Sequence, residues 1–265
     1  MDVSDANAVC PALEYSDTNM SHGLAGTDDD HQRQVEASTS SAPSVPTPPH
    51  ASFLSKDKAV DVLVAKRDLE QRRELGELCR PLDSSPLPPC PPGAAKTLVL
   101  DMDHTLIHTL RIAEDDLRHQ HSNQSPPCDF DVVFNDVGKT WRAKVNIRPG
   151  MLDFLEKVEQ DNYQVVILTA GKRRYADAIL DELESRGHRK LFTHRRFLDS
   201  CCINRRKGTA FKDLSILGRD PSALVLIDDS PEQWAMQPDN VIPVSKWTRA
   251  RLPFDDELAQ LVPLL

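Results

Sequence analysis

From Lys96 onward, short apolar runs alternate with longer stretches whose apolar residues repeat at helical spacing. This alternation predicts βα units around a parallel sheet, because continuous apolar runs suit strands that are covered on both faces. Three runs end at residues that can do chemistry: "TLVL" at Asp101, "QVVIL" at Thr169, and "ALVLI" at Asp228 and Asp229. Ligands in open α/β sheets lie beyond the carboxyl ends of the strands, so we expect these side chains to share one crevice.

A β-hairpin is predicted between the first two of these runs. "CDFDVVFND" and "TWRAKVNI" alternate apolar and polar residues, and "VGK" between them supplies a turn. "RPG" at 148–150 then precedes a predicted helix, "MLDFLEKVEQD", in which Leu152, Leu155 and Val158 repeat at helical spacing. We expect the hairpin to lie over the crevice and these three side chains to be in the core.

The first 95 residues differ in composition from the rest of the chain. They hold eleven of the twenty prolines, and residues 1 to 50 carry eight acids against one base. This composition predicts a disordered acidic tail over residues 1–52. Residues 53–95 are expected to contain a helix over 56–79, suited to packing on the domain or to binding a partner, and a Pro-rich linker. Residues 96–265 are predicted to form one folded domain.

The charge distribution and the cysteine content indicate which classes of partner and which cellular compartments fit this protein. The tail accounts for most of the net charge of -9, whereas residues 172 to 212 hold twelve Lys or Arg against five Asp or Glu. This local excess fits either an anionic ligand or a solvated basic face. Six cysteines without a C-x-x-C pair, no apolar run near the roughly 20 residues that span a bilayer, and no targeting signal favour a nuclear or cytoplasmic protein. We expect no membrane contact and no direct nucleic-acid partner.

Asp101 and Asp103 are separated by a single residue and should repel each other, which predicts a cation between them. Mg²⁺ is favoured because it prefers hard oxygen ligands and commonly links carboxylates to phosphate, and Asp101 and Asp229 supply such ligands. A phosphoryl group drawn to that ion would face Asp101 in line, as in enzymes that form an aspartyl-phosphate. Asp103 can then protonate the departing oxygen and later take a proton from water.

Thr169 and Lys212 are candidate donors to the phosphoryl oxygens, through a hydroxyl and an ammonium group. Taken singly, Asp103 could be a loop cap, Thr169 a strand-end hydroxyl and Lys212 a surface lysine. Together, at three strand ends, they favour a catalytic site.

These motifs resemble a known family. "LVLDMDHTLIH" is similar to the D-x-D-x-T motif of the haloacid dehalogenase superfamily, and "ILTAGKRRYAD", "FKDLSILGRD" and "IDDSPEQW" resemble its RNA polymerase II C-terminal-domain phosphatase branch, the FCP homology domain, over residues 96–265. The resemblance implies a haloacid dehalogenase-like Rossmannoid α/β domain with a central parallel sheet and a β-hairpin insertion. It also implies Mg²⁺ dependence and hydrolysis of phosphoserine or phosphothreonine in proteins, with the RNA polymerase II C-terminal domain as a candidate substrate.

The resemblance also implies roles for single residues. Asp101 would be the nucleophile and Asp103 the acid/base, whose backbone carbonyl also binds the metal. Asp229 would be a metal ligand. Asp228 would orient the neighbouring site residues without binding the metal itself. Thr169 and Lys212 would hold the phosphate.

Substrate contacts are implied for two further residues. Tyr175 matches one wall of a pocket for a substrate proline, and Arg196 is expected on the phosphate side. The sequence departs from the family at His104, where an acid is usual, and at Arg111, near the place of an aromatic pocket residue. Two alternatives stay open: a non-catalytic phosphopeptide-binding module of the same fold, and a phosphatase of a small phosphate ester.

Overall fold

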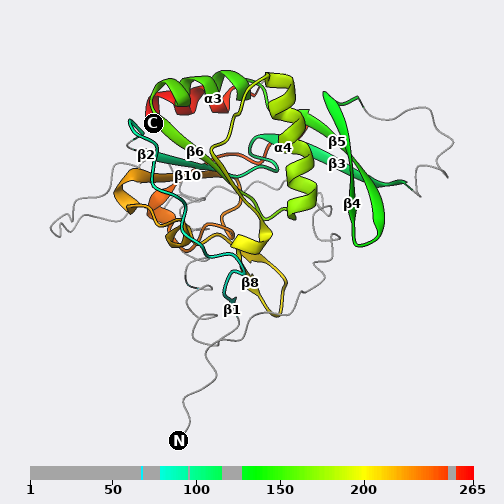
Figure 1. Cartoon of the computed structure of the whole chain (residues 1–265), viewed down its shortest axis with the longest axis horizontal. Coiled ribbons are helices and arrows are strands. Elements are labelled where there is room, and N and C mark those ends of the chain that lie inside the picture. Colours follow the sequence, from blue (N-terminus) through cyan, green and yellow to red (C-terminus); the bar gives the residue numbers. More distant parts are fainter. Residues whose placement is uncertain (1–66, 68–77, 95, 115–126, 250–254) are drawn as a thin grey trace, which may run out of the picture.

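The computed structural model describes residue 67 and residues 78–94, 96–114, 127–249 and 255–265 (Figure 1). The expected disordered tail and most of the expected helix over 56–79 lie outside these residues. For the last two residues of that helix the prediction is wrong, because Leu78–Cys79 form a strand, β1. Its two residues pair antiparallel with β8 (Cys202–Asn204), so a sheet rather than a helix satisfies their backbone groups.

A five-stranded parallel sheet forms the centre of the domain, in the order β11-β10-β2-β6-β7. The three apolar runs of the sequence form its middle, and their central residues are fully buried on both faces. The α/β class with a central parallel sheet is therefore confirmed. The strands are β2 (Lys96–Leu100), β6 (Tyr163–Leu168), β7 (His194–Arg196), β10 (Leu224–Asp228) and β11 (Val241–Pro243).

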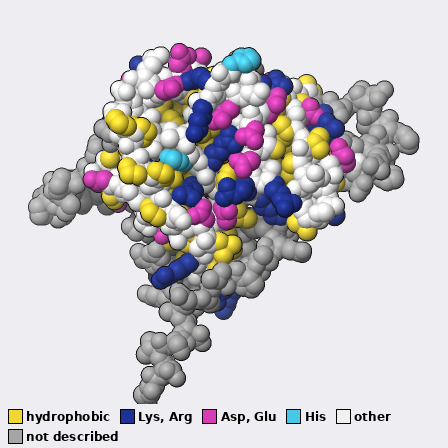
Figure 2. All heavy atoms as spheres, in the orientation of Figure 1, with side chains coloured by type: hydrophobic (Ala, Val, Ile, Leu, Met, Phe, Trp, Pro, Cys, Tyr) yellow, Lys and Arg dark blue, Asp and Glu magenta, His cyan; other side chains and the backbone are white. Residues whose placement is uncertain are grey.

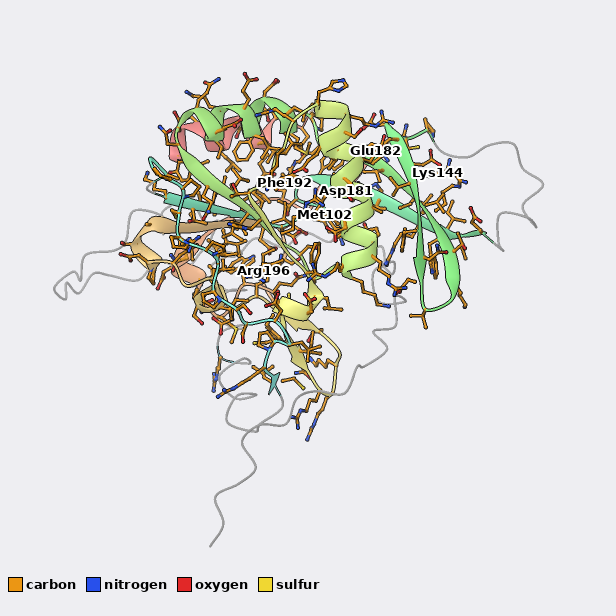
Figure 3. The ribbon with its side chains drawn as sticks, in the orientation of Figure 1. Met102, Lys144, Asp181, Glu182, Phe192 and Arg196 are labelled. Carbon is orange, nitrogen blue, oxygen red and sulfur yellow. The ribbon has the colours of Figure 1, made fainter. Side chains whose placement is uncertain are left out.

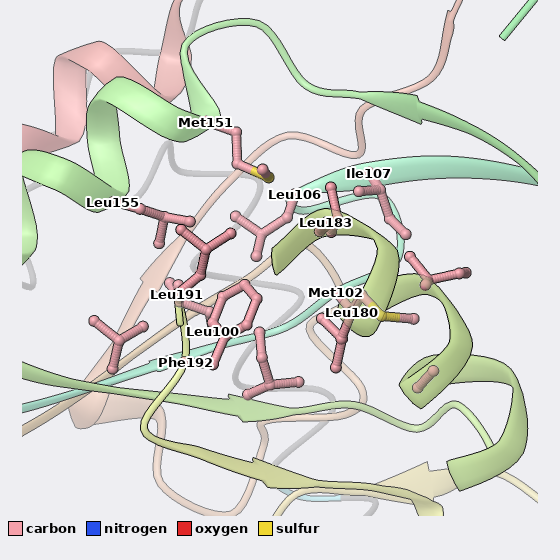
Figure 4. Packing of buried hydrophobic residues seen from close by; sticks show 14 of the residues in the cluster. Leu100, Met102, Leu106, Ile107, Met151, Leu155, Leu180, Leu183, Leu191 and Phe192 are labelled. Atoms are coloured by element: carbon pink, nitrogen blue, oxygen red, sulfur yellow. The ribbon is translucent and has the colours of Figure 1, made fainter. Parts of the chain in front are cut away.

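Three α-helices lie among the described residues: α3 (Met151–Gln160), α4 (Arg173–Gly187) and α5 (Glu257–Leu261). Figure 1 shows α5 beside α3, and the two helices contact each other. Figure 4 shows side chains of α3 and α4, such as Met151 and Leu180, in one buried cluster with Met102 from the loop after β2. Single-turn 3-10 helices cover 198–200, 214–217, 221–223, 238–240 and 262–264.

One core prediction for α3 is wrong. Leu152 is 45% exposed, while Leu155 and Val158 are buried as expected. The buried stripe begins one residue earlier, at Met151, and continues through Phe154, which places it on the face toward the sheet.

The predicted hairpin is confirmed as β4 (Phe130–Asp136) and β5 (Lys139–Ile147). Val137 and Gly138 form its two-residue turn, both with positive φ, at 47° and 73°. A third strand that the sequence analysis did not predict, β3 (Ile107–Ala113), completes the sheet in the order β3-β5-β4. This sheet packs through β4 against α4, beside the central sheet (Figure 1).

The described part of the expected Pro-rich linker is packed on the domain. The side chain of Leu87 is buried, and its N–H donates to the carbonyl of Leu217 at 3.1 Å. Arg219 donates in turn to the carbonyls of Leu87 and Pro88. β1 joins β8 and β9 (Ala210–Phe211) in a small sheet of its own. Within the described ranges, no helix has the length and apolar character needed to cross a bilayer.

Candidate active site

The carboxyl ends of β2 and β10 bring three carboxylates together. Asp101 directly follows β2, Asp228 is the last residue of β10, and Asp229 follows it. The two strands are adjacent and parallel, and the N–H of Asp101 donates to the carbonyl of Ile227 at 3.0 Å. One carboxylate oxygen from each aspartate lies within 4.8 Å of the other two. The predicted convergence of strand ends thus produces a compact acidic group.

Lys212 binds two of these carboxylates. Its Nζ donates to Asp101 Oδ1 at 2.5 Å and to Asp228 Oδ2 at 2.6 Å, and its side chain is fully buried. Burial opposes the charge, but the carboxylates of Asp101 and Asp228 outweigh it and raise the pKa of Lys212 above its ordinary value. Lys212 is therefore a fixed cation in contact with the aspartate that the sequence analysis predicts as nucleophile.

The acidic group has more negative charge than Lys212 can balance. Burial, and then the charge of Asp101, raise the pKa of Asp229 above its ordinary value. Burial also raises the pKa of Asp228, although Lys212 opposes the rise. Oxygen-only donors that repel one another suit a hard divalent cation. The residues present therefore fit a hard divalent cation, the class to which the implied Mg²⁺ belongs.

Not every carboxylate of the group is equally free to bind a cation. Asp228 uses Oδ2 for Lys212 and accepts the N–H of Ser230 on Oδ1 at 2.7 Å. Asp229 accepts the hydroxyl of Thr105 on Oδ1 at 3.3 Å. The geometry therefore favours Asp101 and Asp229 as side-chain ligands, while Asp228 orients Lys212.

Asp103 lies two residues beyond Asp101 but has a different partner. The hydroxyl of Tyr175, on α4, donates to Asp103 Oδ1 at 2.5 Å. Burial raises the pKa of Asp103 to about 6, although this hydrogen bond opposes the rise. The Asp103 side chain is not a member of the acidic group just described. Its expected part in metal binding would fall to its backbone carbonyl, whereas its carboxyl group is suited to proton transfer.

The loop that carries both aspartates makes a tight reversal. His104 has φ 66°, and its N–H donates to the carbonyl of Ile107 at 2.6 Å. Its carbonyl accepts the N–H of Trp247 at 2.8 Å, and its ring Nδ1 lies 3.0 Å from the carbonyl oxygen of Trp247. Burial lowers the pKa of His104. His104, at whose position the sequence analysis expected an acid, thus ties the loop to residue 247.

Thr169 stands at the end of β6, next to β2 in the sheet. Its buried hydroxyl accepts the N–H of Gly171 at 3.0 Å. A Cβ at Gly171 would lie 3.2 Å from Thr169 Oγ1 and 3.2 Å from Tyr175 Cδ1, so glycine fits this turn best. The structure thus places Thr169 directly before the turn into α4, and its hydroxyl proton remains available to donate.

Arg196, on β7, has partners that the sequence analysis did not foresee. Arg196, which is labelled in Figure 3, donates from Nη1 to Asp83 at 2.5 Å and from Nη2 to the carbonyl of Ser85 at 2.8 Å. Its backbone carbonyl accepts the N–H of Thr169 at 3.0 Å. The guanidinium therefore holds segment 78–94, and this geometry does not support the predicted phosphate-side role.

Comparison with known proteins shows the family of this chain. The family model described as "NLI interacting factor-like phosphatase" matches residues 96–265. This chain belongs to that family. CTD small phosphatase-like protein 2 of Dictyostelium discoideum is 37% identical over 180 residues, which cover 68% of this chain and 28% of the relative. CTD small phosphatase-like protein 3 of Caenorhabditis elegans is 35% identical over 170 residues, which cover 64% and 53%.

Among solved structures, that of Fcp1, described as an essential RNA polymerase II CTD phosphatase, is similar over 65% of this chain and 50% of the Fcp1 chain, with 24% identity and a TM-score of 0.43. The relatives just named are matched over about half of their length or less. The resemblance to the C-terminal-domain phosphatase branch that the motifs predicted is confirmed.

In this member of the NLI interacting factor-like phosphatase family, Arg148 holds the acidic loop, the segment after β2 that carries Asp101 and Asp103. Arg148 is fully buried and donates to the carbonyl of Thr105 at 3.0 Å. It also forms two hydrogen bonds with Asp255, at 2.9 and 3.0 Å, and one with Glu257 at 2.7 Å. Sequence reasoning missed this network because Asp255 is 107 residues away; the only signal was a charged residue beside the apolar start of α3.

Proposed function

We propose that this chain is a Mg²⁺-dependent phosphoprotein phosphatase that acts through an aspartyl-phosphate on Asp101. The observation that carries the proposal is the contact of Lys212 with both Asp101 and Asp228 inside a group of three carboxylates. Family membership supports the same chemistry. Because relatives are named CTD small phosphatase-like proteins, we further propose phosphoserine or phosphothreonine in proteins as the substrate, with the RNA polymerase II C-terminal domain as a candidate.

The first half-reaction forms the covalent intermediate. A carboxylate oxygen of Asp101 attacks phosphorus, and the bond from phosphorus to the serine oxygen breaks. The carboxyl group of Asp103 gives its proton to that oxygen, so the product leaves as an alcohol. A pKa of about 6 keeps a useful fraction of Asp103 protonated near neutral pH. Lys212 and the Thr169 hydroxyl donate to the phosphoryl oxygens as their negative charge develops.

The second half-reaction frees the enzyme. Asp103, now a carboxylate, takes a proton from water, and the water oxygen attacks phosphorus. The bond from Asp101 to phosphorus breaks, which returns the Asp101 carboxylate and releases inorganic phosphate. Asp101 and Asp229 would hold the Mg²⁺, with the Asp103 carbonyl as a third ligand. When bound, the ion would neutralise phosphoryl oxygens and align phosphorus with Asp101.

The test is hydrolysis of a phosphoserine peptide by the full chain with Mg²⁺. Asp101→Asn should lower kcat by at least about a thousandfold, because it removes the attacking oxygen. Asp153→Asn, an exposed acid on α3, is the matched control and should leave kcat unchanged. Undiminished hydrolysis by Asp101→Asn would reject the mechanism. Peptide binding without phosphate release would favour the binding module, and faster turnover of sugar phosphates would favour a small ester.

A further inference from the structure

The turn after β6, residues 169–171, is hydrogen-bonded at both ends to the chain at the end of β7. The N–H of Thr169 donates to the carbonyl of Arg196 at 3.0 Å. The carbonyl of Gly171 accepts the N–H of Leu198 at 3.0 Å. We call these residues the phosphate turn, because they carry the Thr169 hydroxyl that is proposed to donate to the phosphoryl group. The position of the phosphate turn therefore depends on the position of the chain at the end of β7.

That part of the chain is held in turn by residues 82–85, which we call the strap. The strap precedes the region that the family model matches. Asp83 accepts Nη1 of Arg196 at 2.5 Å, and the carbonyl of Ser85 accepts its Nη2 at 2.8 Å. The N–H of Asp83 donates to the carbonyl of Asp199 at 2.8 Å. These hydrogen bonds connect the strap to the chain on both sides of the residue that holds the phosphate turn.

The ion pair between Asp83 and Arg196 is partly shielded from water. The exposed fraction is 14% for the side chain of Arg196 and 27% for that of Asp83. Burial opposes the charge of Asp83, but the N–H of Ser85 and the charge of Arg196 outweigh it and lower the pKa of Asp83. Asp83 is therefore charged at neutral pH, and a guanidinium group stays charged in proteins. Salt screens such a pair less than a fully exposed one.

We propose that Asp83 and Arg196 are positioning residues for the phosphoryl group of the substrate, which they affect by holding the phosphate turn in place. This inference rests on the proposed function and extends it to the strap. Neither side chain contacts the phosphoryl group, and both act through the backbone of Thr169. A hydrogen-bond donor stabilises developing charge only at the right distance, and a displacement of about 1 Å can remove most of its effect.

Binding of inorganic phosphate to the full chain with Mg²⁺ tests the proposal without turnover. Isothermal titration calorimetry would give the Kd. Asp83→Ala and Arg196→Met should each raise the Kd about fivefold. Arg196→Lys should restore part of the affinity, because it keeps the charge without the two donors of the planar fork. A Kd that is unchanged in both Asp83→Ala and Arg196→Met would overturn the proposal.

The double variant shows whether the two residues act through their contact. Asp83→Ala with Arg196→Met should raise the Kd no more than either change alone, because each change already removes the same ion pair. Independent effects would multiply to about 25-fold. That result would overturn a shared role of the pair in positioning the turn.

Hydrogen exchange at the N–H of Thr169 reports on the phosphate turn itself, with no ligand present. Asp83→Ala should increase its exchange rate about fivefold, because the chain that accepts this N–H opens more easily once the strap is released. The rate would be followed by NMR on the full chain. Unchanged exchange in both Asp83→Ala and Arg196→Met would overturn the proposal even if the Kd rises, since the strap would then not hold the turn.

Two control variants separate positioning from a general loss of structure. Asp220, like Asp83, accepts the N–H of a serine two residues on, Ser222 at 2.9 Å, but it is exposed. Asp220→Ala should leave the Kd and the exchange rate unchanged. Val158→Ala removes buried contacts in α3, outside the strap and the turn, and should lower stability while the Kd stays the same. If Val158→Ala raises the Kd as much as Asp83→Ala, the effect follows stability alone and the proposal is overturned.

Hydrolysis of a phosphoserine peptide by the same variants is measured in parallel, so that the two proposals can fail separately. No hydrolysis by the wild-type chain, together with a phosphate Kd and an exchange rate that depend on Asp83, would reject the proposed function and keep the positioning role. Hydrolysis with the same kcat/KM, Kd and exchange rate in wild type and Asp83→Ala would keep the function and reject the positioning role.

Discussion

Tyr175 donates one hydrogen bond of 2.5 Å to the carboxyl group of Asp103, and this contact opposes the rise in pKa that burial causes. A donor to a carboxylate favours the charged form and lowers its pKa. Tyr175→Phe removes that donor, so the pKa of Asp103 should rise above about 6. We therefore consider a profile of kcat against pH for a phosphoserine peptide. Its high-pH limb, on which the rate falls as Asp103 loses its proton, should move to higher pH in the variant.

The control for Tyr175→Phe is an aryl phosphate with a good leaving group, whose departure needs no proton. Its high-pH limb should be nearly the same in both enzymes, since Asp103 is not needed as an acid. If the peptide profile keeps its limb in Tyr175→Phe, Asp103 is not the proton donor of the first step.

The loss of Lys212 should lower stability as well as activity. Lys212→Met leaves Asp101 and Asp228 buried without their cation, which should lower the free energy of unfolding by about 3 kcal/mol at pH 7. Burial already raises the pKa of Asp228, and Lys212 opposes that rise, so the Asp228 carboxyl group should take up a proton more readily in the variant. The loss should therefore shrink as the pH falls toward 5, as urea unfolding at both pH values would show.

The matched substitution for Lys212→Met is Lys157→Met, because Lys157 forms an exposed ion pair with Asp161 four residues along α3. Such pairs contribute about 0.5 kcal/mol or less. Equal losses for the two variants would contradict a buried, structurally required ammonium group at Lys212.

At the scale of elements, Arg148 connects α5 to the acidic loop, because it donates both to Glu257 at the start of α5 and to the carbonyl of Thr105. Arg148 and Asp255 are both buried, and Arg148 also fixes the carbonyl of Thr105, whose hydroxyl donates to Asp229. Asp255→Asn should lower the free energy of unfolding by about 2 kcal/mol, and kcat should fall more than KM rises because the loop is displaced. Its neighbour Asp256 is exposed, and Asp256→Asn should do neither. A loss of stability with unchanged kcat would show that the ion pair of Asp255 and Arg148 does not position the loop.

The sequence predicts those elements whose burial gives them a simple pattern. β2, β6 and β10 are covered on both faces and appear as continuous apolar runs, while β4 and β5 alternate. β1 has two residues and pairs with β8, 126 residues away at Leu78 and Asn204, so no local pattern marks it. The same distinction holds in the site. Strand ends bring Asp101 and Asp228 together, but contacts such as Tyr175 with Asp103 depend on how α4 packs, which no spacing reveals.

At the scale of the whole molecule, residues 78–94 are part of the folded unit. β1 extends the β8–β9 pair, Leu87 is buried, and Asp83 binds Arg196 at the edge of the central sheet. Arg196 in turn accepts the N–H of Thr169 through its carbonyl. A short chain of bonds thus connects this segment to the phosphate side of the proposed site.

Charges of both signs lie side by side on the surface of the domain. Over α4, Lys and Arg side chains alternate with Asp and Glu (Figure 2). Arg195 there binds Asp177 at 3.0 Å and Glu184 at 2.9 Å. At least seven of the twelve Lys and Arg residues between 172 and 212 form ion pairs, and the buried Lys212 is one of them. Of the two interpretations of that local excess of cations, an anionic ligand or a solvated basic face, the solvated face describes α4 best.

The central claim is that Asp101 becomes covalently bound to phosphorus. The chain would be allowed to turn over a phosphoserine peptide in the presence of Mg²⁺. The reaction would then be quenched in acid, treated with borohydride and examined by peptide mass spectrometry. Borohydride reduces an acyl phosphate to an alcohol, so the account predicts homoserine at position 101 and an unmodified aspartate at position 103. Reduction at Asp103, or active turnover in which no aspartate is ever modified, would contradict it.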